Sequence, residues 1–224
     1  MGVIKALDGN AAIAHGVMRS KVQLVAAYPI TPQTPIVETI SSLIDKKEYD
    51  ATYITVESEH SALSAVIGAA STGVRTFTAS ASHGLALMHE VTGVASASRL
   101  PVVMAVVSRA IPGPMCLWCD HSDIMTQRDQ GWIQLFAESP QEGLDFTMIA
   151  YRTSEDERVL TPTMVDIDGF YCSHLTEPVD VPTEDEAERF ISEFRPVNAQ
   201  LNTDMPYAID NLSSPAIFTE IKRS

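Results

Sequence analysis

The residues of this chain that are best suited to chemistry follow its apolar, β-branched segments. In an open parallel sheet, ligands bind beyond the carboxyl ends of the strands, so side chains directly after predicted strands are the first candidates for a site. The candidates are Thr31 in YPITP, Glu59 in VESEH, Ser82 and His83 in SASHG, Arg109 in SRAIP, and Asp120, His121 and Asp123 in DHSD.

Glu59 begins a predicted helix whose later residues, ALSAVIGAA, are nearly all small or apolar. A carboxylate at this position is expected to face a poorly solvated cleft, where it can share a proton with a ligand. The alternative is that Glu57 and Glu59 only favour the positive end of the helix dipole. The spacing alone leaves both interpretations open.

Arg109 directly follows a predicted buried strand, where a guanidinium can offer a two-pronged grip to a substrate carboxylate. The alternative is an ion pair with a neighbouring aspartate. Thr31 lies between two prolines, which would stiffen the turn and hold its hydroxyl in place. An ordinary turn residue is the equal alternative for Thr31.

Metal binding by this chain is not predicted. The potential ligands match no HExxH or paired Cys/His spacing; they are His83, His89 and His121 with Asp120 and Asp123. Cys116 and Cys119 form a C-x-x-C pair, but no second pair accompanies them, so free thiols are expected. The chain also lacks GxSxG, Walker and GxGxxG motifs, which excludes hydrolase, P-loop and Rossmann sites at the motif level.

The elements that must position these residues alternate between apolar β-branched segments and alanine-rich stretches of helical length. This alternation predicts an α/β fold, a doubly wound parallel sheet with helices on both faces. Strands are predicted over residues 22–28, 52–56, 75–80, 101–107, 132–136 and 163–168. Helices are predicted after an N-cap at Asn10, over 33–45 and 58–72, and from about Ser82, Ser139 and Thr183. Residues 111–129 are expected to form an irregular, functional or mobile loop.

Two helix starts carry capping signals. Ser139, Pro140 and Glu142 combine an N-cap, a first-turn proline and a capping box, and Thr183 and Glu186 form a second capping box. Periodicity fades after residue 194. We therefore predict one domain over residues 1–194, followed over 195–224 by a connecting arm or the start of a truncated further domain.

Composition excludes some partners. The net charge of −14 argues against nucleic acid and anionic membranes, which are bound through an excess of Lys and Arg. The N-terminus has no signal-peptide pattern, no run of ~18 apolar residues occurs, and three cysteines suit a reducing compartment. A cytoplasmic protein is expected.

Several segments together resemble one family. They are GNAAIAHGV, AAYPITPQTPIVE, VESEHSALSAVIGAASTGVRTFTASASHGLALMHE, SRAIPGP, DHSD and RDQGWIQLFAES. Over about residues 5–175 they resemble, in order, the α subunit of pyruvate:ferredoxin oxidoreductase and its 2-oxoacid relatives. The resemblance implies a thiamine diphosphate-binding fold of the pyrimidine type.

The activity implied by the resemblance is conversion of pyruvate and coenzyme A to acetyl-CoA and carbon dioxide, with electrons passed to ferredoxin, or the reverse synthase reaction. An aromatic, branched-chain or dicarboxylic 2-oxoacid is the close alternative, with the loop from Pro112 to Trp118 as a candidate selector. A non-catalytic scaffold or fragment and a transketolase-like pyrimidine domain are two further hypotheses.

The resemblance also implies roles for residues. Glu59 would bond the aminopyrimidine ring nitrogen of the cofactor and promote its activation. Thr31 and Arg109 would contact the 2-oxoacid, and the three residues are the expected catalytic set. The expected cofactor-binding residues are Glu59, Pro29, Ile30, Ser82, His83 and Gly84.

Partner subunits are needed for the rest of the site. Thiamine diphosphate enzymes usually hold the magnesium-bound diphosphate with a Gly-Asp-Gly motif. This sequence contains no such motif. A β subunit should therefore carry the diphosphate and Mg²⁺. Three cysteines cannot supply ferredoxin-like clusters, so 4Fe-4S clusters should lie in δ and γ subunits or domains that reduce ferredoxin. The segment from Cys116 to Cys119 departs from the family pattern.

Overall fold

The computed structural model describes residues 2–111, 113–197, 201–206, 208, 214, 216 and 217. Its strands are β1 (Val3–Leu7), β2 (Leu24–Ala26), β3 (Thr52–Ile54), β4 (Thr76–Ser80), β5 (Val103–Ser108), β6 (Ile133–Ala137), β7 (Thr163–Asp168) and β8 (Glu177–Val181). Its helices are α1 (Gly9–Arg19), α2 (Thr34–Asp45), α3 (Glu59–Ala70), α4 (Ser82–Ala97), α5 (Ser122–Met125), α6 (Pro140–Ser154) and α7 (Glu184–Ile191).

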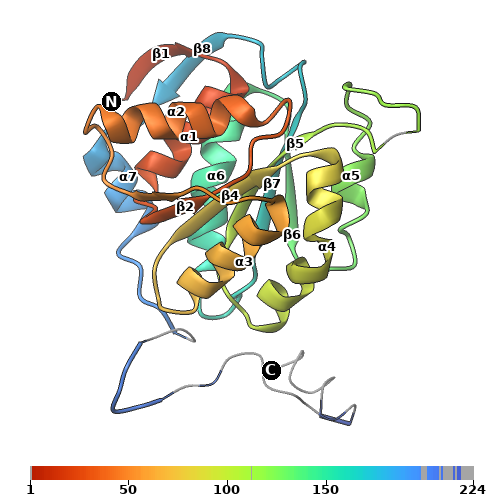
Figure 1. The fold of residues 1–224 in the computed structure, drawn as a ribbon. Helices are drawn as coiled ribbons and strands as arrows, with labels where there is room; N and C mark the ends of the chain where they lie inside the picture. Colours follow the sequence, from red (N-terminus) through yellow and green to blue (C-terminus); the bar gives the residue numbers. More distant parts are fainter. Residues whose placement is uncertain are drawn as a thin grey trace.

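Six parallel strands form the central sheet in the order β3-β2-β4-β5-β7-β6 (Figure 1). The chain leaves β2 toward the β3 edge and then returns to β4 on the other side of β2. The strand order therefore reverses between β2 and β4, which is where open α/β sheets bind ligands beyond the strand ends. The six predicted strands are confirmed.

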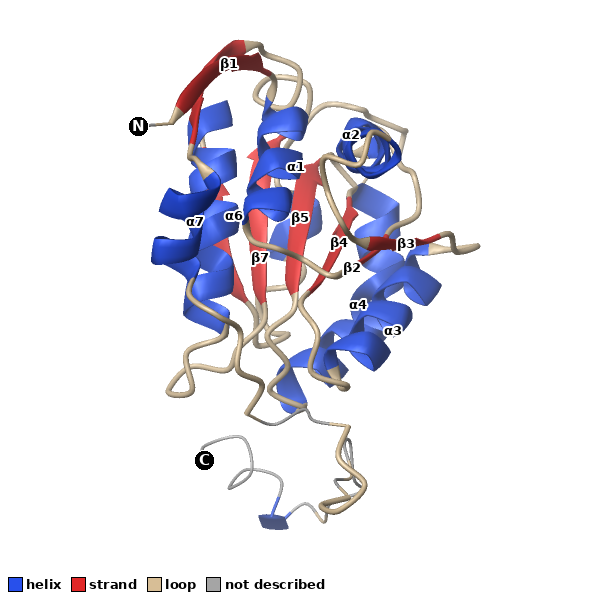
Figure 2. Ribbon diagram, turned by 90° about the vertical axis from the view of Figure 1, so that its left-hand side faces the viewer, coloured by secondary structure: helices blue, strands red, loops and turns tan. Residues whose placement is uncertain are grey.

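Helices cover both faces of the sheet, as predicted (Figure 2). The side chains of the fully buried strand β5 show how the two layers are divided. Val103, Ala105 and Val107 pack with residues of α1, α2 and α6, whereas Met104 and Val106 pack with residues of α3, α4 and α5. Because successive side chains of a strand point to opposite faces, one apolar strand supplies both cores.

A small third layer was not predicted. Strands β1 and β8 pair antiparallel as a two-stranded ribbon, and β8 packs with α7 against α1 and α6. Val3 and Ile4 of β1 are largely exposed, and β8 alternates acidic residues and proline with valine. Neither segment has the continuous apolar character of the central strands, so only their mutual pairing defines them.

The helix caps correct one prediction and refine another. The N-cap of α1 is Asp8, whose carboxylate accepts the Ala11 amide, and not Asn10, which lies within the helix. Ser139 caps α6 as predicted by accepting the Glu142 amide. The Glu142 carboxylate accepts the amide of Glu138 and not that of Ser139.

The second capping box is confirmed at α7. Thr183 accepts the Glu186 amide, and the Glu186 carboxylate accepts the Thr183 amide. This helix ends at Ile191. The predicted boundary at 194 stays a prediction, because much of the segment 195–224 lies outside the described residues. In the described part of the chain, no helix is long and apolar enough to cross a membrane.

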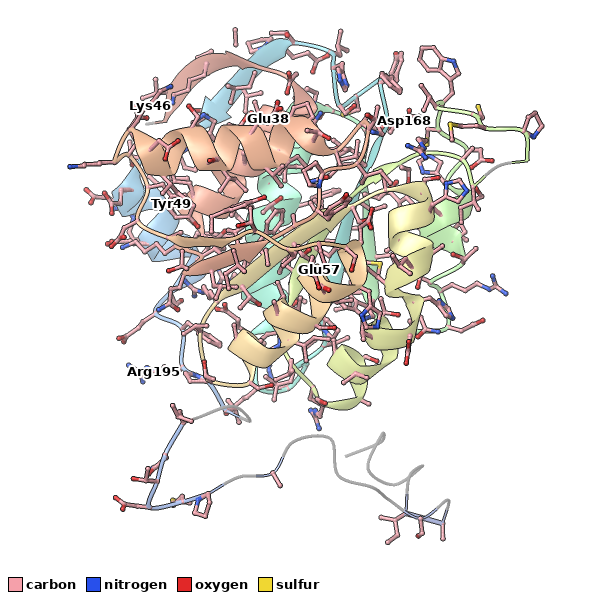
Figure 3. All side chains as sticks on the ribbon, viewed as in Figure 1. Glu38, Lys46, Tyr49, Glu57, Asp168 and Arg195 are labelled. Carbon is pink, nitrogen blue, oxygen red and sulfur yellow. The ribbon has the colours of Figure 1, made fainter. Side chains whose placement is uncertain are left out.

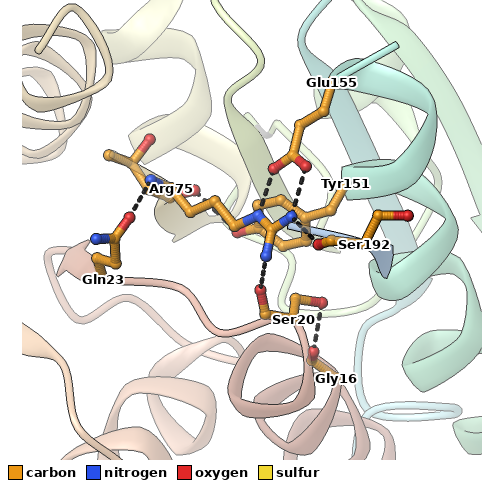
Figure 4. A network of polar contacts seen from close by, with 8 residues as sticks. Gly16, Ser20, Gln23, Arg75, Tyr151, Glu155 and Ser192 are labelled. Carbon is orange, nitrogen blue, oxygen red and sulfur yellow. Dashed lines mark hydrogen bonds and ion pairs between the residues drawn. The ribbon is translucent and has the colours of Figure 1, made fainter. Parts of the chain in front are cut away.

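A buried ion pair lies at the amino edge of the sheet, away from the candidate site (Figure 4). Arg75 precedes β4 and donates to both carboxylate oxygens of Glu155 at 2.6 and 2.7 Å. The same guanidinium donates to the carbonyls of Ser20 and Ser192, both at 3.0 Å. It thus joins α6 to the ends of α1 and α7.

Candidate active site

The predicted site residues lie at the carboxyl edge of the sheet, near the point where the strand order reverses. Residues 27–33 follow β2, and Glu59 begins α3 after β3. Residues 82–84 are the first three of α4, which follows β4, and Arg109 follows β5. Strands β3, β2, β4 and β5 are parallel neighbours in this order, so their carboxyl ends meet at this edge of the sheet.

Glu59 is the first residue of α3, after the N-cap Ser58. It is 8% exposed, and no hydrogen bond to its carboxylate is found from any described residue. The nearby Glu57 is exposed, and its carboxylate accepts the Ser61 hydroxyl at 2.9 Å, which lowers the pKa of Glu57. The two glutamates are therefore distinct: Glu57 is a solvated residue before the helix, and Glu59 is a buried acceptor without a donor in the described part of the chain.

The absence of a side chain at Gly84 leaves the space that the Glu59 carboxylate occupies. A Cβ atom at Gly84 would lie 2.5 Å from Oε1 of Glu59 and 2.7 Å from Oγ of Ser80. The Ser80 hydroxyl is also buried without a hydrogen-bond partner among the described residues. A buried polar group without a partner is costly, so these two groups are suited to an incoming ligand.

Arg109 is 6% exposed, and its guanidinium contacts two other predicted site residues. Nη1 donates to the carbonyl of Thr31 at 2.8 Å, and Nη2 lies 3.4 Å from Nδ1 of His83. No carboxylate of the described residues pairs with this guanidinium, so the predicted alternative of an aspartate ion pair is not found. The positive charge is left to attract an anion from outside the chain.

The YPITP turn is held mainly through its backbone. The side-chain amide of Asn10 donates to the Pro32 carbonyl at 3.1 Å, and Gln33 Oε1 accepts the Ile30 amide at 3.3 Å. Thr31 is exposed, and its hydroxyl makes no hydrogen bond with the described residues. Pro29 is exposed and Ile30 half-buried, so this turn presents its surface at the edge of the sheet.

Asp123 connects the two segments that carry His83 and Arg109. Its Oδ2 accepts the amides of Ser82 at 2.8 Å and Arg109 at 3.0 Å. Its Oδ1 accepts the Ser108 hydroxyl at 2.9 Å. The carboxylate is fully buried and fixes both backbone segments. Its sequence position after a strand marked it as a candidate, but its positioning role was not predicted.

Ser82 has a left-handed backbone conformation, with φ of 46°. Its hydroxyl donates to the Ala110 carbonyl at 2.7 Å, in addition to the amide contact with Asp123. These bonds fix a backbone conformation that residues other than glycine seldom adopt. Ser82 thus sets the positions of His83, which is exposed, and Gly84, which is buried.

Asp166 of β7 continues this polar network behind the site. The Ser108 oxygen is also within hydrogen-bond distance of Asp166 Oδ1, and because this hydroxyl has one hydrogen, it donates to either Asp123 or Asp166 at a given time. Nδ1 of His121 lies 2.9 Å from Asp166 Oδ2 at ion-pair distance, without hydrogen-bond geometry. Burial raises the pKa of Asp166 to about 7, while the contacts with Ser108 and His121 act in the opposite direction. Asp166 was not among the predicted site residues because its strand has the pattern of an ordinary buried strand.

The remaining candidates lie elsewhere. Asp120 is exposed and accepts the Ser122 amide at 2.8 Å. His89 lies on α4, where Nδ1 contacts Gln127 Oε1 at 2.9 Å. The structure thus groups Thr31, His83 and Arg109, and Glu59 with Gly84, but it does not gather the histidines into one metal site.

Comparisons with known proteins identify relatives over nearly the whole chain. A family model described as pyruvate flavodoxin/ferredoxin oxidoreductase, thiamine diphosphate-binding, matches residues 15–224. The pyruvate synthase subunit PorA of Pyrococcus furiosus is 46% identical over 220 residues, which is 98% of this chain and 56% of that protein. The PorA of Thermotoga maritima is 47% identical over 218 residues, which is 97% of this chain and 56% of that protein.

A related subunit is nearly as similar. The ketoisovalerate oxidoreductase subunit VorA of Pyrococcus furiosus is 43% identical over 218 residues, covering 97% of this chain and 55% of that protein. The chain thus spans about half the length of the curated relatives it matches.

A solved structure also matches the fold. It is the 2-oxoglutarate:ferredoxin oxidoreductase from Magnetococcus marinus with 2-oxoglutarate, coenzyme A and succinyl-CoA bound. The match has a TM-score of 0.73 and 25% sequence identity, and it covers 82% of this chain and 32% of that chain. On the family match over residues 15–224, this chain belongs to the thiamine diphosphate-binding family of pyruvate flavodoxin/ferredoxin oxidoreductases.

Proposed function

We propose that this chain supplies the pyrimidine-binding side of a thiamine diphosphate site in a pyruvate:ferredoxin oxidoreductase. The observation that carries the proposal is the Glu59 carboxylate, which is buried against Gly84 at the carboxyl edge of the sheet and accepts no hydrogen bond from the described residues. Membership in a thiamine diphosphate-binding family supports the choice of ligand.

Glu59 fits an aminopyrimidine ring. A carboxyl group in this position can exchange a proton with a ring nitrogen, and the absence of a side chain at Gly84 leaves the space that this carboxylate occupies. The unpartnered hydroxyl of Ser80 adds a second polar group on the same wall. When bound, the cofactor supplies the electron sink for cleavage of the 2-oxoacid, and Glu59 holds the proton at the ring nitrogen.

Arg109 and its neighbours fit the substrate. The guanidinium is buried, charged and not paired with a carboxylate of the described residues, so it can bind the carboxylate of a 2-oxoacid. The Thr31 hydroxyl is free of hydrogen bonds to the described residues and is available to the same ligand. His83 contacts the same guanidinium at 3.4 Å through Nδ1. Pro29 and Ile30 form the adjoining surface.

Other subunits complete this site. The chain has no Gly-Asp-Gly segment, so we assign the diphosphate and Mg²⁺ to a β subunit. Exposed apolar side chains of the loops at the carboxyl edge, including Met115, Trp118 and Tyr171, support a partner that covers this edge. The electrons pass, in this proposal, to 4Fe-4S clusters of δ and γ subunits and then to ferredoxin. The three free cysteines support a cytoplasmic location for this complex.

Pyruvate is the first substrate candidate, because the PorA proteins of Pyrococcus furiosus and Thermotoga maritima are 46% and 47% identical to the chain. A branched-chain 2-oxoacid is the second, because VorA is 43% identical over a similar length. The two relatives differ too little in similarity to separate the substrates without a measurement. Coenzyme A is the proposed acyl acceptor, and the reverse synthase reaction uses the same site.

The experiment is anaerobic reduction of a viologen dye by the assembled complex, with coenzyme A and a panel of 2-oxoacids. Glu59→Gln should lower the rate by at least about 100-fold, which is the typical contribution of a positioned acid or base. Glu57→Gln is the matched control and should retain activity, because Glu57 is exposed. Near-normal activity of Glu59→Gln would reject its role. A folded, cofactor-loaded complex that reduces no dye with any 2-oxoacid would reject the function.

A further inference from the structure

Three potential metal ligands lie together beside the polar network of the site. The ligand atoms of Cys119, His121 and Asp168 all lie within 4.8 Å of one another, and each residue is half-buried. Cys119 and His121 belong to the loop before α5, and Asp168 ends β7 at the base of that loop (Figure 3). The tertiary structure therefore unites residues whose sequence spacing predicted no metal site.

The orientation of His121 suits a ligand. Its Nδ1 lies 2.9 Å from the carboxylate of Asp166, which is 1% exposed, at ion-pair distance but without hydrogen-bond geometry. Histidine ligands of metals are usually oriented by a carboxylate or carbonyl at the second ring nitrogen. A small rotation of the ring would let Nδ1 donate to Asp166 and would leave Nε2 for a cation.

Cys119 forms no disulfide, and it is half-buried. Its sulfur is therefore available as a ligand, because zinc in proteins is bound by cysteine thiolates.

We propose that Cys119, His121 and Asp168 bind one Zn²⁺ ion, with water at the fourth position. A set of one sulfur, one imidazole nitrogen and one carboxylate oxygen suits tetrahedral zinc, whereas Mg²⁺ and Ca²⁺ prefer oxygen ligands throughout. The three ligand atoms already lie within 4.8 Å of one another, so adjustments of the side chains can bring all three to one ion.

The ion would fasten the loop that follows Arg109. Trp118 already contacts the ring of Phe170 with a centroid distance of 5.2 Å, and its carbonyl accepts the Ala110 amide at 3.0 Å. Beyond His121, the contacts run through Asp166 and Ser108 to Asp123, which holds the Arg109 amide. Zinc binding would therefore stabilise the backbone that presents Arg109, and it does not require the proposed reaction.

The test is zinc analysis of the purified complex that contains the full-length chain. We expect about one zinc ion per copy of the chain, and anomalous difference density at the zinc absorption edge between these three residues. Cys119→Ser and Asp168→Asn should lose this zinc. Cys116→Ser is the matched control and should retain it, because Cys116 lies in the same loop but outside the group.

Each outcome decides the proposal. Zinc density at the group in the wild-type crystal supports it even where a variant fails to fold. Wild-type complex without zinc density at the group, after purification in zinc-containing buffer, would overturn it. Density at the iron edge alone would overturn the zinc assignment. Retention of full zinc content in a folded Cys119→Ser variant would also overturn it.

Discussion

Gly84 lies directly against Glu59: a Cβ atom at Gly84 would come within 2.5 Å of Oε1 of the glutamate. The glycine is the third residue of α4 and the glutamate is the first of α3, so the contact joins two helices that cover the same face of the sheet. Because a side chain at position 84 would displace the carboxylate, the glycine determines where Glu59 lies in the proposed pyrimidine site.

Gly84→Ala should therefore abolish most activity while the fold is retained. The added methyl group would push the Glu59 carboxylate from its position, and a displacement of about 1 Å can cost about 100-fold in rate. Gly68→Ala is the control, because a Cβ atom there meets nothing within 4 Å. It lies on the exposed side of α3 and should raise stability by up to about 1 kcal/mol. Dye reduction and urea denaturation measure both effects, and full activity of Gly84→Ala would contradict the proposed contact with the cofactor.

Arg109→Lys should weaken use of the 2-oxoacid by about 10- to 100-fold in kcat/KM, which corresponds to the loss of a charge-assisted hydrogen bond. The single ammonium group of lysine cannot donate to the Thr31 carbonyl and also bind a substrate carboxylate through two parallel hydrogen bonds. Arg128→Lys, at an exposed arginine, is the control. Steady-state kinetics with pyruvate distinguish them, and unchanged kinetic constants for Arg109→Lys would rule out its assignment.

Asp123→Asn should disturb the position of Arg109 without removing any group that touches substrate. Each carboxylate oxygen of Asp123 accepts from two donors, and the amide nitrogen of asparagine accepts from none. The buried donors on the oxygen that it replaces therefore lose their partner, at a cost of about 1–3 kcal/mol each. We expect KM for the 2-oxoacid to rise more than kcat falls. Asp129→Asn, at an exposed aspartate, should leave both constants unchanged. An equal loss of kcat with constant KM would argue against a positioning role.

Arg75→Met should destabilise the chain by about 3–5 kcal/mol, because it leaves the Glu155 carboxylate buried without its cation. The double variant Arg75→Met/Glu155→Leu should recover much of that loss, since no buried charge remains. Arg158→Met is the control: this arginine pairs with Asp156 at the surface, where its side chain is 85% exposed, and the change should be small. Urea denaturation of the purified chain measures the series. A double variant no more stable than Arg75→Met would contradict the explanation.

Stability should fall between pH 6.5 and 4 because of His15. Burial, with smaller contributions from Lys5 and Arg19, lowers the pKa of His15 from 6.5 to about 4. The unfolded chain therefore binds this proton at a higher pH than the folded chain, and folding loses up to about 3 kcal/mol on acidification through that range. His15→Leu should remove this part of the pH dependence. The measurement is the unfolding free energy of the wild-type chain and of His15→Leu as a function of pH. Identical slopes for the two proteins would show that His15 does not contribute.

The sequence determined much of the architecture, because its signals are local. Apolar β-branched segments identified the six strands of the parallel sheet, and Ser139 and Thr183 marked two helix starts by capping chemistry. The motifs around Thr31, Glu59 and Arg109 pointed to the family that the comparisons show. Each of these signals lies within a few residues of the feature that it predicts.

The tertiary structure decided what depends on distant residues. It buried Glu59 and left Glu57 exposed, two positions apart in one helix start, because Gly84 and Ser80 come from another part of the chain. It turned Asn10 from a predicted cap into a support for Pro32, and it made Asp123 the anchor of two amides. It also brought Asp168 to Cys119 and His121. Such contacts arise when parallel strands align their ends, so the spacing of residues along one chain segment cannot reveal them.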